Sequence, residues 1–128
     1  MTTRQIDIDA FEAKARESLA SATADLAAGR YNSCVNRCYF ACFQAAITAL
    51  IRADVLPVQS EFPHSFVQER FEGILVRRRR LYSPSFVGVL QDLRLLRTQA
   101  DYRPTGVTSR PATRAVQRAT AFVAGVLR

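Results

Sequence analysis

An arginine and a glutamine interrupt the most apolar stretch of the chain, residues 32–51, which read NSCVNRCYFACFQAAITALI. Arg37 keeps its charge at any physiological pH, and an unpaired guanidinium inside a protein costs several kcal/mol. We therefore expect an anionic or acceptor-rich group opposite Arg37. Two arrangements meet this requirement: an internal ion pair, for which Asp101 is the candidate, or a phosphate group held in a groove.

Three cysteines lie at intervals of four residues within the same stretch, at Cys34, Cys38 and Cys42. Side chains at that spacing line one side of a helix and point away in parallel, so no pair is placed for a disulfide. A zinc site would need a fourth ligand, for which His64 is the only histidine available. Buried free cysteine is a routine core residue, and we predict neither a metal nor another cofactor.

The elements that position these residues are predicted to be helices, from apolar periodicity and capping signals. The expected helices cover residues 9–28, 31–53, 64–79 and 84–102, and a fifth begins at residue 111. Asn32 or Ser33 would cap the second helix, and Ser83 with Pro84 would open the fourth. A chain of 128 residues has room for one core. We expect a single domain over residues 1–128, an all-α bundle of four to five helices.

The second expected helix carries the polar residues on one stripe. On a helical wheel, Asn36, Arg37 and Gln44 fall together, and apolar side chains fill most of the remaining circumference. A helix with this pattern lies at the centre of a bundle. Its polar stripe must then face a cleft, a partner chain or a buried polar network.

Positive charge is concentrated in the second half of the chain. Residues 1–69 hold six basic and eight acidic side chains, whereas residues 70–128 hold twelve and three. Such a field favours polyanions, above all nucleic acid, and a solvated arginine face is the alternative. The run Arg77, Arg78, Arg79 and Arg80 allows both interpretations. The N-terminus lacks an apolar signal core, and polar residues break the one long apolar run. We expect a cytoplasmic protein with no membrane partner.

The second helix, the later segment PHSFVQERFEGIL and the segment LLRTQADYRP together resemble the HEPN superfamily. The similar branch reads roughly SRAYYAMFHAARALL, then H-S-G-V, then LR..ADY, and the resemblance covers about residues 19–103. It implies a helical bundle that dimerises and is often encoded beside a minimal nucleotidyltransferase or in toxin–antitoxin and defence loci. Many members are metal-independent endoribonucleases that use an arginine and a histidine of one helix at a dimer groove.

Within this resemblance, Arg37 matches the motif arginine and Asn36 the polar residue beside it, while Gln44 stands in the place of the histidine. Cleavage of RNA needs a group that moves a proton, and an amide has no usable pKa near neutrality. Cleavage by Arg37 and Gln44 alone is therefore expected to be feeble, although Gln44 could still orient a phosphate.

The remaining matched residues have both structural and functional interpretations. His64 matches the H-S pair at the start of a helix, where capping or a buried hydrogen bond is expected and catalysis is the alternative. Asp101 and Tyr102 match the ADY segment, in which the acid is expected to pair with an arginine such as Arg37 or Arg97.

Two functional hypotheses follow from the resemblance and the charge distribution. In the first, the protein is an RNA-directed effector of a bacterial toxin–antitoxin or defence system, a homodimer that binds RNA and cleaves it weakly at most. In the second, it is a catalytically inactive HEPN scaffold that regulates a nucleotidyltransferase or toxin, binding nucleotide or protein. An antitoxin or nucleotidyltransferase is the expected partner protein.

Overall fold

The computed structural model describes all 128 residues and consists of helices and connecting loops, which confirms the all-α expectation. The α-helices are α1 (Thr3–Ala27), α2 (Tyr31–Arg52), α3 (His64–Arg70), α4 (Val89–Tyr102) and α5 (Ser109–Val126). α3 continues without a break into a π-helical segment, η1 (Phe71–Arg78), and a short 3-10 helix, η2 (Pro84–Phe86), precedes α4.

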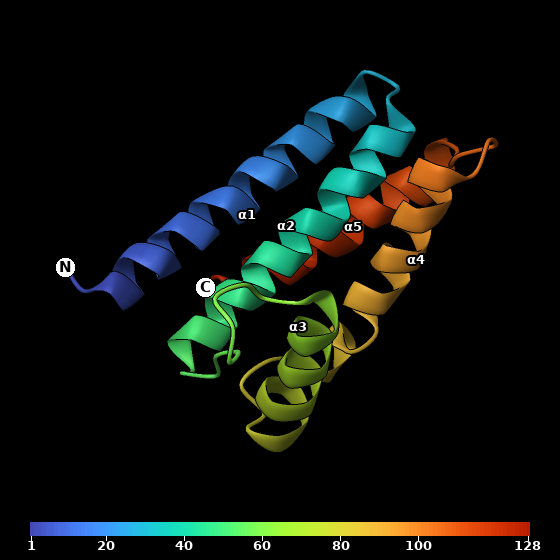
Figure 1. The fold of residues 1–128 in the computed structure, drawn as a ribbon. Helices are drawn as coiled ribbons and strands as arrows, with labels where there is room; N and C mark the ends of the chain where they lie inside the picture. The colour runs from blue at the N-terminus through green and yellow to red at the C-terminus, as the bar shows by residue number, and fades with distance from the viewer.

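α2 lies at the centre of the bundle, as its apolar circumference predicts. It packs against α1, α4 and α5, and Figure 1 shows α1 and α4 on either side of it with α5 behind. Fourteen of its 22 residues are buried. By length and composition α2 could cross a membrane, but 78% of its most apolar window is covered by the other helices. Burial of this kind is typical of the core helix of a bundle.

The three cysteines of α2 are free and buried, as expected for core residues. Burial raises the pKa of each thiol, so all three stay protonated near neutrality. Protonated thiols in this environment act as small apolar groups that fill the space between α2 and its neighbours.

The start of α1 was predicted too late in the chain. α1 begins at Thr3 instead of residue 9, because the hydroxyl of Thr2 accepts a hydrogen bond from the backbone N–H of Gln5 at 3.1 Å. Such a cap satisfies one of the free N–H groups at a helix start.

The caps predicted for α2 were wrong, because both side chains bond to other elements. Asn32 Oδ1 accepts a hydrogen bond from the N–H of Val107 at 2.8 Å, which ties the loop before α5 to the start of α2. Ser33 Oγ donates to Asp25 near the end of α1 at 2.6 Å. The α2 N-terminus itself has no side-chain cap.

The expected helix over residues 84–102 begins later than predicted. Ser83 accepts a hydrogen bond from the N–H of Ser85, but the turn that it caps is η2. Gly88 then takes a left-handed conformation, with φ of 87°, and α4 starts only at Val89. Of the other predicted helices, the third ends in the π-helical turns of η1, and the last begins two residues before Pro111.

Candidate functional site

Arg37 lies on the side of α2 between α1 and α4, and its charge has no carboxylate partner. Its Nε and Nη2 donate to Oδ1 of the neighbouring Asn36 at 3.1 and 2.7 Å. Its guanidinium carbon lies 5.2 Å from the ring centre of Phe40. None of the ion pairs in the structure includes Arg37. The guanidinium is therefore oriented by an amide and a ring and remains able to bind an anion.

Asn36 connects Arg37 to the predicted acid on α4. Its Nδ2 donates to Asp101 Oδ2 at 3.0 Å, and the same oxygen lies 3.9 Å from Nε of Arg97. Asp101 thus approaches an arginine as expected, but that arginine is Arg97, at a long distance. Arg37 reaches the carboxylate only through the amide of Asn36.

Arg97 is half-enclosed by aromatic rings. Its guanidinium carbon lies 5.5 Å from the ring centre of Tyr39 and 5.3 Å from that of Phe40. Its Nε is buried and has no hydrogen-bond partner. Phe40 therefore contacts two guanidinium groups, those of Arg37 and Arg97. With Asp101 as the one carboxylate bound to this group, the local charge is positive.

His64 begins α3 and is packed against three aromatic residues of α2, Tyr39, Phe40 and Phe43. Its ring stacks on Phe43 at 4.5 Å between centres and on Tyr39 at 5.6 Å. The hydroxyl of Tyr39 is hydrogen-bonded to His64 Nδ1. Burial, with smaller contributions from Arg94 and Arg97, lowers the pKa of His64, while burial raises the pKa of Tyr39.

The protonation states of this pair follow from its pKa shifts. A neutral imidazole and a protonated phenol are the forms that these shifts favour near neutrality, and the tautomer of the imidazole decides which of Tyr39 and His64 Nδ1 donates. In either tautomer Nδ1 is occupied by this bond. The buried hydrogen bond expected for His64 is present.

Gln44 faces α1. Its side-chain amide lies 2.7 Å from Ser18 Oγ. In the orientation that satisfies both ends of the amide, its nitrogen donates to the carbonyl oxygens of Lys14 and Phe40, each at 3.0 Å. Gln44 therefore serves the contact between α1 and α2. A small polar cavity of about 210 Å³ still joins it to Arg37, with a lining of Lys14, Glu17, Ser18, Ser21, Arg37 and Gln44.

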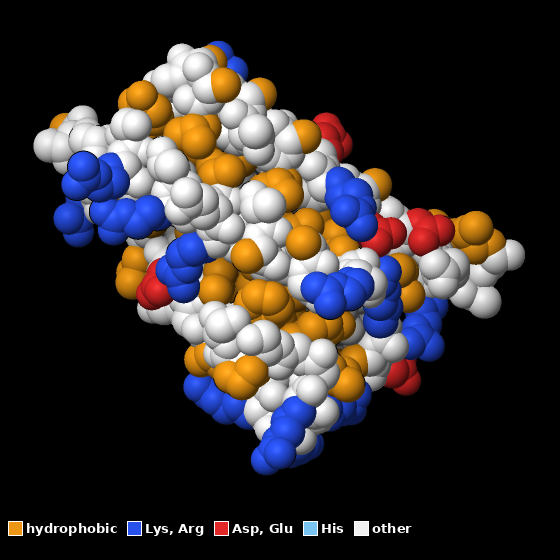
Figure 2. All heavy atoms as spheres, turned by 180° about the vertical axis from the view of Figure 1, so that it is seen from behind, with side chains coloured by type: hydrophobic (Ala, Val, Ile, Leu, Met, Phe, Trp, Pro, Cys, Tyr) orange, Lys and Arg blue, Asp and Glu red, His pale blue; other side chains and the backbone are white.

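The predicted arginine run does not join this site. Arg79 donates to the carbonyl oxygen of Ala53, just beyond the C-terminal end of α2, at 3.2 Å. Ala53 lies sixteen residues after Arg37 along α2, which corresponds to roughly 24 Å. The side chains of Arg77, Arg78 and Arg80 are exposed beside it. Figure 2 shows arginine and lysine side chains spread over the back of the molecule and not gathered in one stripe.

The structure adds residues that the sequence interpretation missed. Phe40 contacts both arginines, whereas the predicted Tyr102 follows Asp101 and is 73% exposed at the end of α4. α1 supplies Lys14 and Ser18 to the cavity beside Arg37. The polar residues 14, 17, 18 and 21 recur at intervals of three and four, the spacing of one helix face, which was a usable signal.

The comparison with protein families gives a match over most of the chain. The model described as HEPN domain matches residues 10–128, which is nearly the whole chain and extends beyond the resemblance seen in the sequence. No curated protein matches the chain at a significant level.

Proposed function

The chain belongs to the HEPN domain family, and from this premise we propose that it binds RNA along the half-buried polar side of α2, with cleavage that is weak at most. In this proposal Arg37 binds a phosphate group, and Arg97 and Lys14 add positive charge on either side of it. A second copy of the chain covers the same side of α2, so that two Arg37 residues face one RNA strand.

The observation that carries the proposal is the pairing of Arg37 with an amide. The oxygen of Asn36 accepts from Nε and Nη2, while Nη1 has no partner within the chain. A guanidinium held in one plane with unsatisfied donors is suited to phosphate, because two parallel N–H groups can bind two phosphate oxygens. The buried, unpartnered Nε of Arg97 is a second donor in the same cluster.

The chemistry of the cluster supports binding better than cleavage. Attack by a ribose 2′-hydroxyl needs a base to accept its proton, and the loss of such a group lowers rates by a factor of about 100 to 10,000. Gln44 cannot accept a proton, and Nδ1 of His64 is bound to Tyr39. No other imidazole is present in the chain.

A binding measurement tests the proposal. A fluorescent single-stranded RNA is titrated with the wild type and with Arg37→Ala, by anisotropy, in buffer without divalent metal. A charged hydrogen bond is worth on the order of 1.5–3 kcal/mol, so Arg37→Ala should weaken binding at least about tenfold. Arg16→Ala is the matched control, because Arg16 is exposed on α1 and pairs only with Glu12 of the same helix. Equal affinities for all three proteins would contradict the proposal.

A cleavage assay in the presence of a metal chelator tests the weak activity separately. We expect little cleavage by the wild type, less by Arg37→Ala and more by Gln44→His. Because Gln44 bonds to α1, the folding of Gln44→His is checked first by thermal unfolding. A folded, dimeric Gln44→His that remains inactive would show that the cluster lacks other groups needed for cleavage.

The inactive scaffold is the second candidate, and the geometry of Gln44 favours it. A side chain that joins α2 to α1 through Ser18 and Lys14 contributes to folding without contributing to proton transfer. Under this proposal the same side of α2 binds nucleotide or the partner nucleotidyltransferase, toxin or antitoxin in the cytoplasm. RNA affinity that is independent of Arg37, with no cleavage by any variant, would support the scaffold over the RNA-binding effector.

A further inference from the structure

A second hollow lies between η1 and the segment that leads into η2, away from Arg37. Its volume is about 710 Å³, within the range of small-molecule sites. Val76, Leu81, Pro84 and Val87 give it aliphatic walls, and Arg77 and Arg80 are its only charged lining residues. No acidic side chain lines the hollow.

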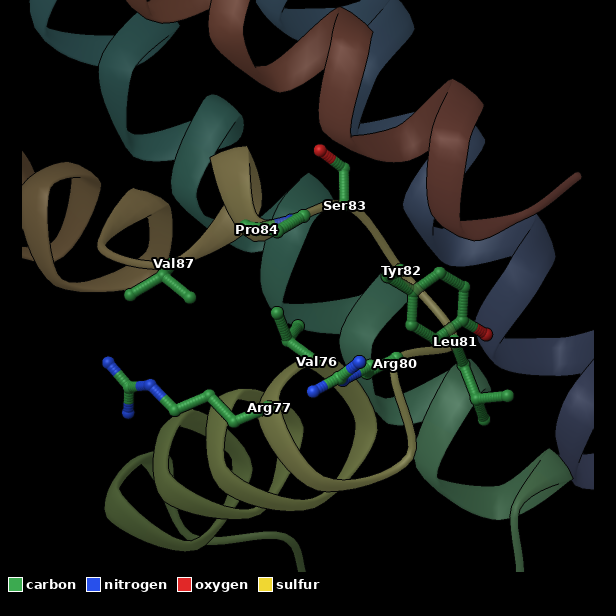
Figure 3. A pocket seen from close by; sticks show the side chains of 8 residues that line it. All are labelled: Val76, Arg77, Arg80, Leu81, Tyr82, Ser83, Pro84 and Val87. Atoms are coloured by element: carbon green, nitrogen blue, oxygen red, sulfur yellow. The ribbon is translucent and has the colours of Figure 1, made fainter.

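The two arginines of the hollow have no partner inside the protein. No ion pair in the structure involves Arg77 or Arg80, and neither guanidinium makes a hydrogen bond, whereas Arg79 between them in the sequence donates to Ala53. Figure 3 shows the guanidinium of Arg80 beside Val76, whereas the side chain of Arg77 extends away from Arg80 and ends near Val87. Two free guanidinium groups thus line one hollow, on either side of it.

The backbone that holds Arg80 is constrained. Arg80 has φ of 53°, a left-handed conformation that is strained for a residue other than glycine. The turn is held by hydrogen bonds from the N–H of Leu81 to the carbonyl of Leu75 and from Arg79 to Ile74, both at 2.8 Å. Strain of this kind persists only where the surroundings enforce it and is concentrated at ligand-binding sites.

The opposite wall is fixed as well. The carboxylate of Glu72 accepts a hydrogen bond from the N–H of Gly88 at 2.7 Å, which anchors the chain just after Val87. The ring of Tyr82 stacks on Phe71 at 5.5 Å between centres, and Figure 3 shows it extending to the side away from Arg77. The hollow is therefore bounded by ordered backbone on both sides before any ligand binds.

The chemistry of the lining selects the ligand. Two guanidinium forks suit a tetrahedral oxyanion with several acceptor oxygens, which is a phosphate group. The aliphatic walls suit an apolar or planar body attached to it. The hydroxyl of Ser83 is hydrogen-bonded to the hydroxyl of Ser85 at 2.8 Å. We therefore expect few hydrogen bonds between the lining and the edge of a base.

We propose that this hollow binds a phosphate monoester joined to a nucleoside, either a free nucleoside monophosphate or the 5′-phosphorylated end of an RNA, without selecting the base. The phosphate lies between Arg77 and Arg80, and the nucleoside packs against Val76 and Val87. This site goes beyond the RNA binding proposed for Arg37 and shares no residue with it.

NMR titration of the full chain with AMP, adenosine and inorganic phosphate tests the site. AMP should shift the backbone amides of residues 76–87 and bind at least about tenfold more tightly than adenosine or phosphate alone, because only AMP uses both the guanidinium pair and the aliphatic walls. A tetranucleotide with a 5′-phosphate, compared with its 5′-hydroxyl form, separates an RNA end from a free nucleotide as the natural ligand. Absence of these shifts at millimolar AMP would overturn the proposal.

Three arginine variants make the test specific. Arg77→Gln and Arg80→Asn should each weaken AMP binding about tenfold, and Arg78→Gln, which removes the same charge from the same run, should leave it unchanged. Asparagine is chosen at position 80 because it tolerates the left-handed conformation. If Arg78→Gln weakened AMP binding equally, the affinity would depend on the general positive charge of the run, and the proposed site would be overturned. Arg37→Ala should leave AMP binding intact, which separates this proposal from the one for α2.

Discussion

Arg37 keeps its charge while its orientation is fixed, because the amide of Asn36 supplies its hydrogen bonds. A carboxylate at that position would hold the guanidinium equally well but would cancel the charge that a phosphate needs. Asp101 accepts from the other end of the amide at 3.0 Å, so the oxygen of Asn36 is turned toward Arg37. Asn36 therefore acts as a neutral spacer between a cation and an acid.

The position of Asn36 between Arg37 and Asp101 predicts the effect of exchanging the amide of residue 36 with the carboxylate of residue 101. The double variant Asn36→Asp, Asp101→Asn keeps an amide-to-carboxylate hydrogen bond across α2 and α4 but places the charge directly against Arg37. We expect RNA affinity to fall about tenfold, as for Arg37→Ala, with thermal stability close to that of the wild type. Anisotropy and thermal unfolding measure the two effects. Wild-type affinity in the folded double variant would show that the charge of Arg37 plays no part.

His64 predicts a pH dependence of stability. Its pKa in the folded protein is lowered from 6.5, first by burial and then by Arg94 and Arg97. The unfolded chain therefore takes up a proton on His64 at a higher pH than the folded chain, so protonation favours unfolding. Stability should be constant above about pH 7 and should fall as the pH drops through 6.5 toward the folded pKa.

Urea unfolding midpoints between pH 7.5 and pH 5 would measure this dependence, with His64→Gln as the comparison. The variant should be less stable throughout, because it loses the stack on Phe43, and its stability should vary less between pH 7 and pH 5. Parallel pH profiles for the two proteins would assign the dependence to other groups.

For single residues, the sequence predicted that Arg37 needs a hydrogen-bond acceptor nearby, but it did not predict which residue supplies that acceptor. Helical spacing placed Arg37 and Gln44 on one stripe, yet Gln44 meets Ser18 on α1 while Arg37 meets Asn36 and an aromatic ring. Spacing fixes the direction of a side chain only within a sector of the helix. Which neighbouring helix covers that sector depends on packing angles that no local signal encodes.

Among the elements, the existence and order of the five α-helices followed from apolar periodicity, whereas several of their ends did not. Capping rules treat Asn and Ser as partners of the nearest backbone, but Asn32 bonds to the loop before α5 and Ser33 to the end of α1. These side chains exchange a local bond for one that joins distant segments. The left-handed Gly88 that delays the start of α4 likewise depends on a contact with Glu72, sixteen residues earlier.

The contact of Asn32 with the loop before α5 predicts a cost for substituting Gly106. Gly106 has φ of 60°, and an added Cβ would lie 2.5 Å from Asn32 Oδ1, the atom that accepts the hydrogen bond from Val107. Gly106→Ala should therefore lower the free energy of unfolding by about 1–3 kcal/mol in urea titrations. Gly73→Ala is the matched control, since an added Cβ there has no neighbour within 4 Å. Equal stability of the two variants would contradict a tight contact at Asn32.

On the scale of the whole molecule, the half-buried polar side of α2 is the surface that we expect a second copy to cover. α4 borders it and carries two large exposed side chains seven residues apart, Leu95 at 60% and Tyr102 at 73% exposure. Residues at that interval lie on one face of a helix. An exposed apolar pair of this kind is suited to a partner surface.

Leu95→Glu should therefore convert a dimer into a monomer, because it would place a charge in an apolar contact. Light scattering after gel filtration measures the mass directly. Val58→Glu is the control, since Val58 is fully exposed on the loop after α2. A wild-type chain that is monomeric, or a Leu95→Glu variant that remains dimeric, would place the interface elsewhere or exclude it.

The salt dependence of RNA binding distinguishes a defined site from a diffuse positive field. The net charge is +7, and the basic side chains visible in Figure 2 are dispersed, so RNA at low salt would meet many of them. For single-stranded RNA each phosphate contact contributes about −0.7 to the slope of log affinity against log salt. If two Arg37 residues of a dimer each bind one phosphate, Arg37→Ala should make the slope shallower by about 1.4. Arg118→Gln removes an arginine already paired with Asp92 at 2.9 Å and should leave the slope unchanged. Identical slopes for all three proteins would mean that the RNA is held by scattered arginines, with Arg37 serving only the packing of α2.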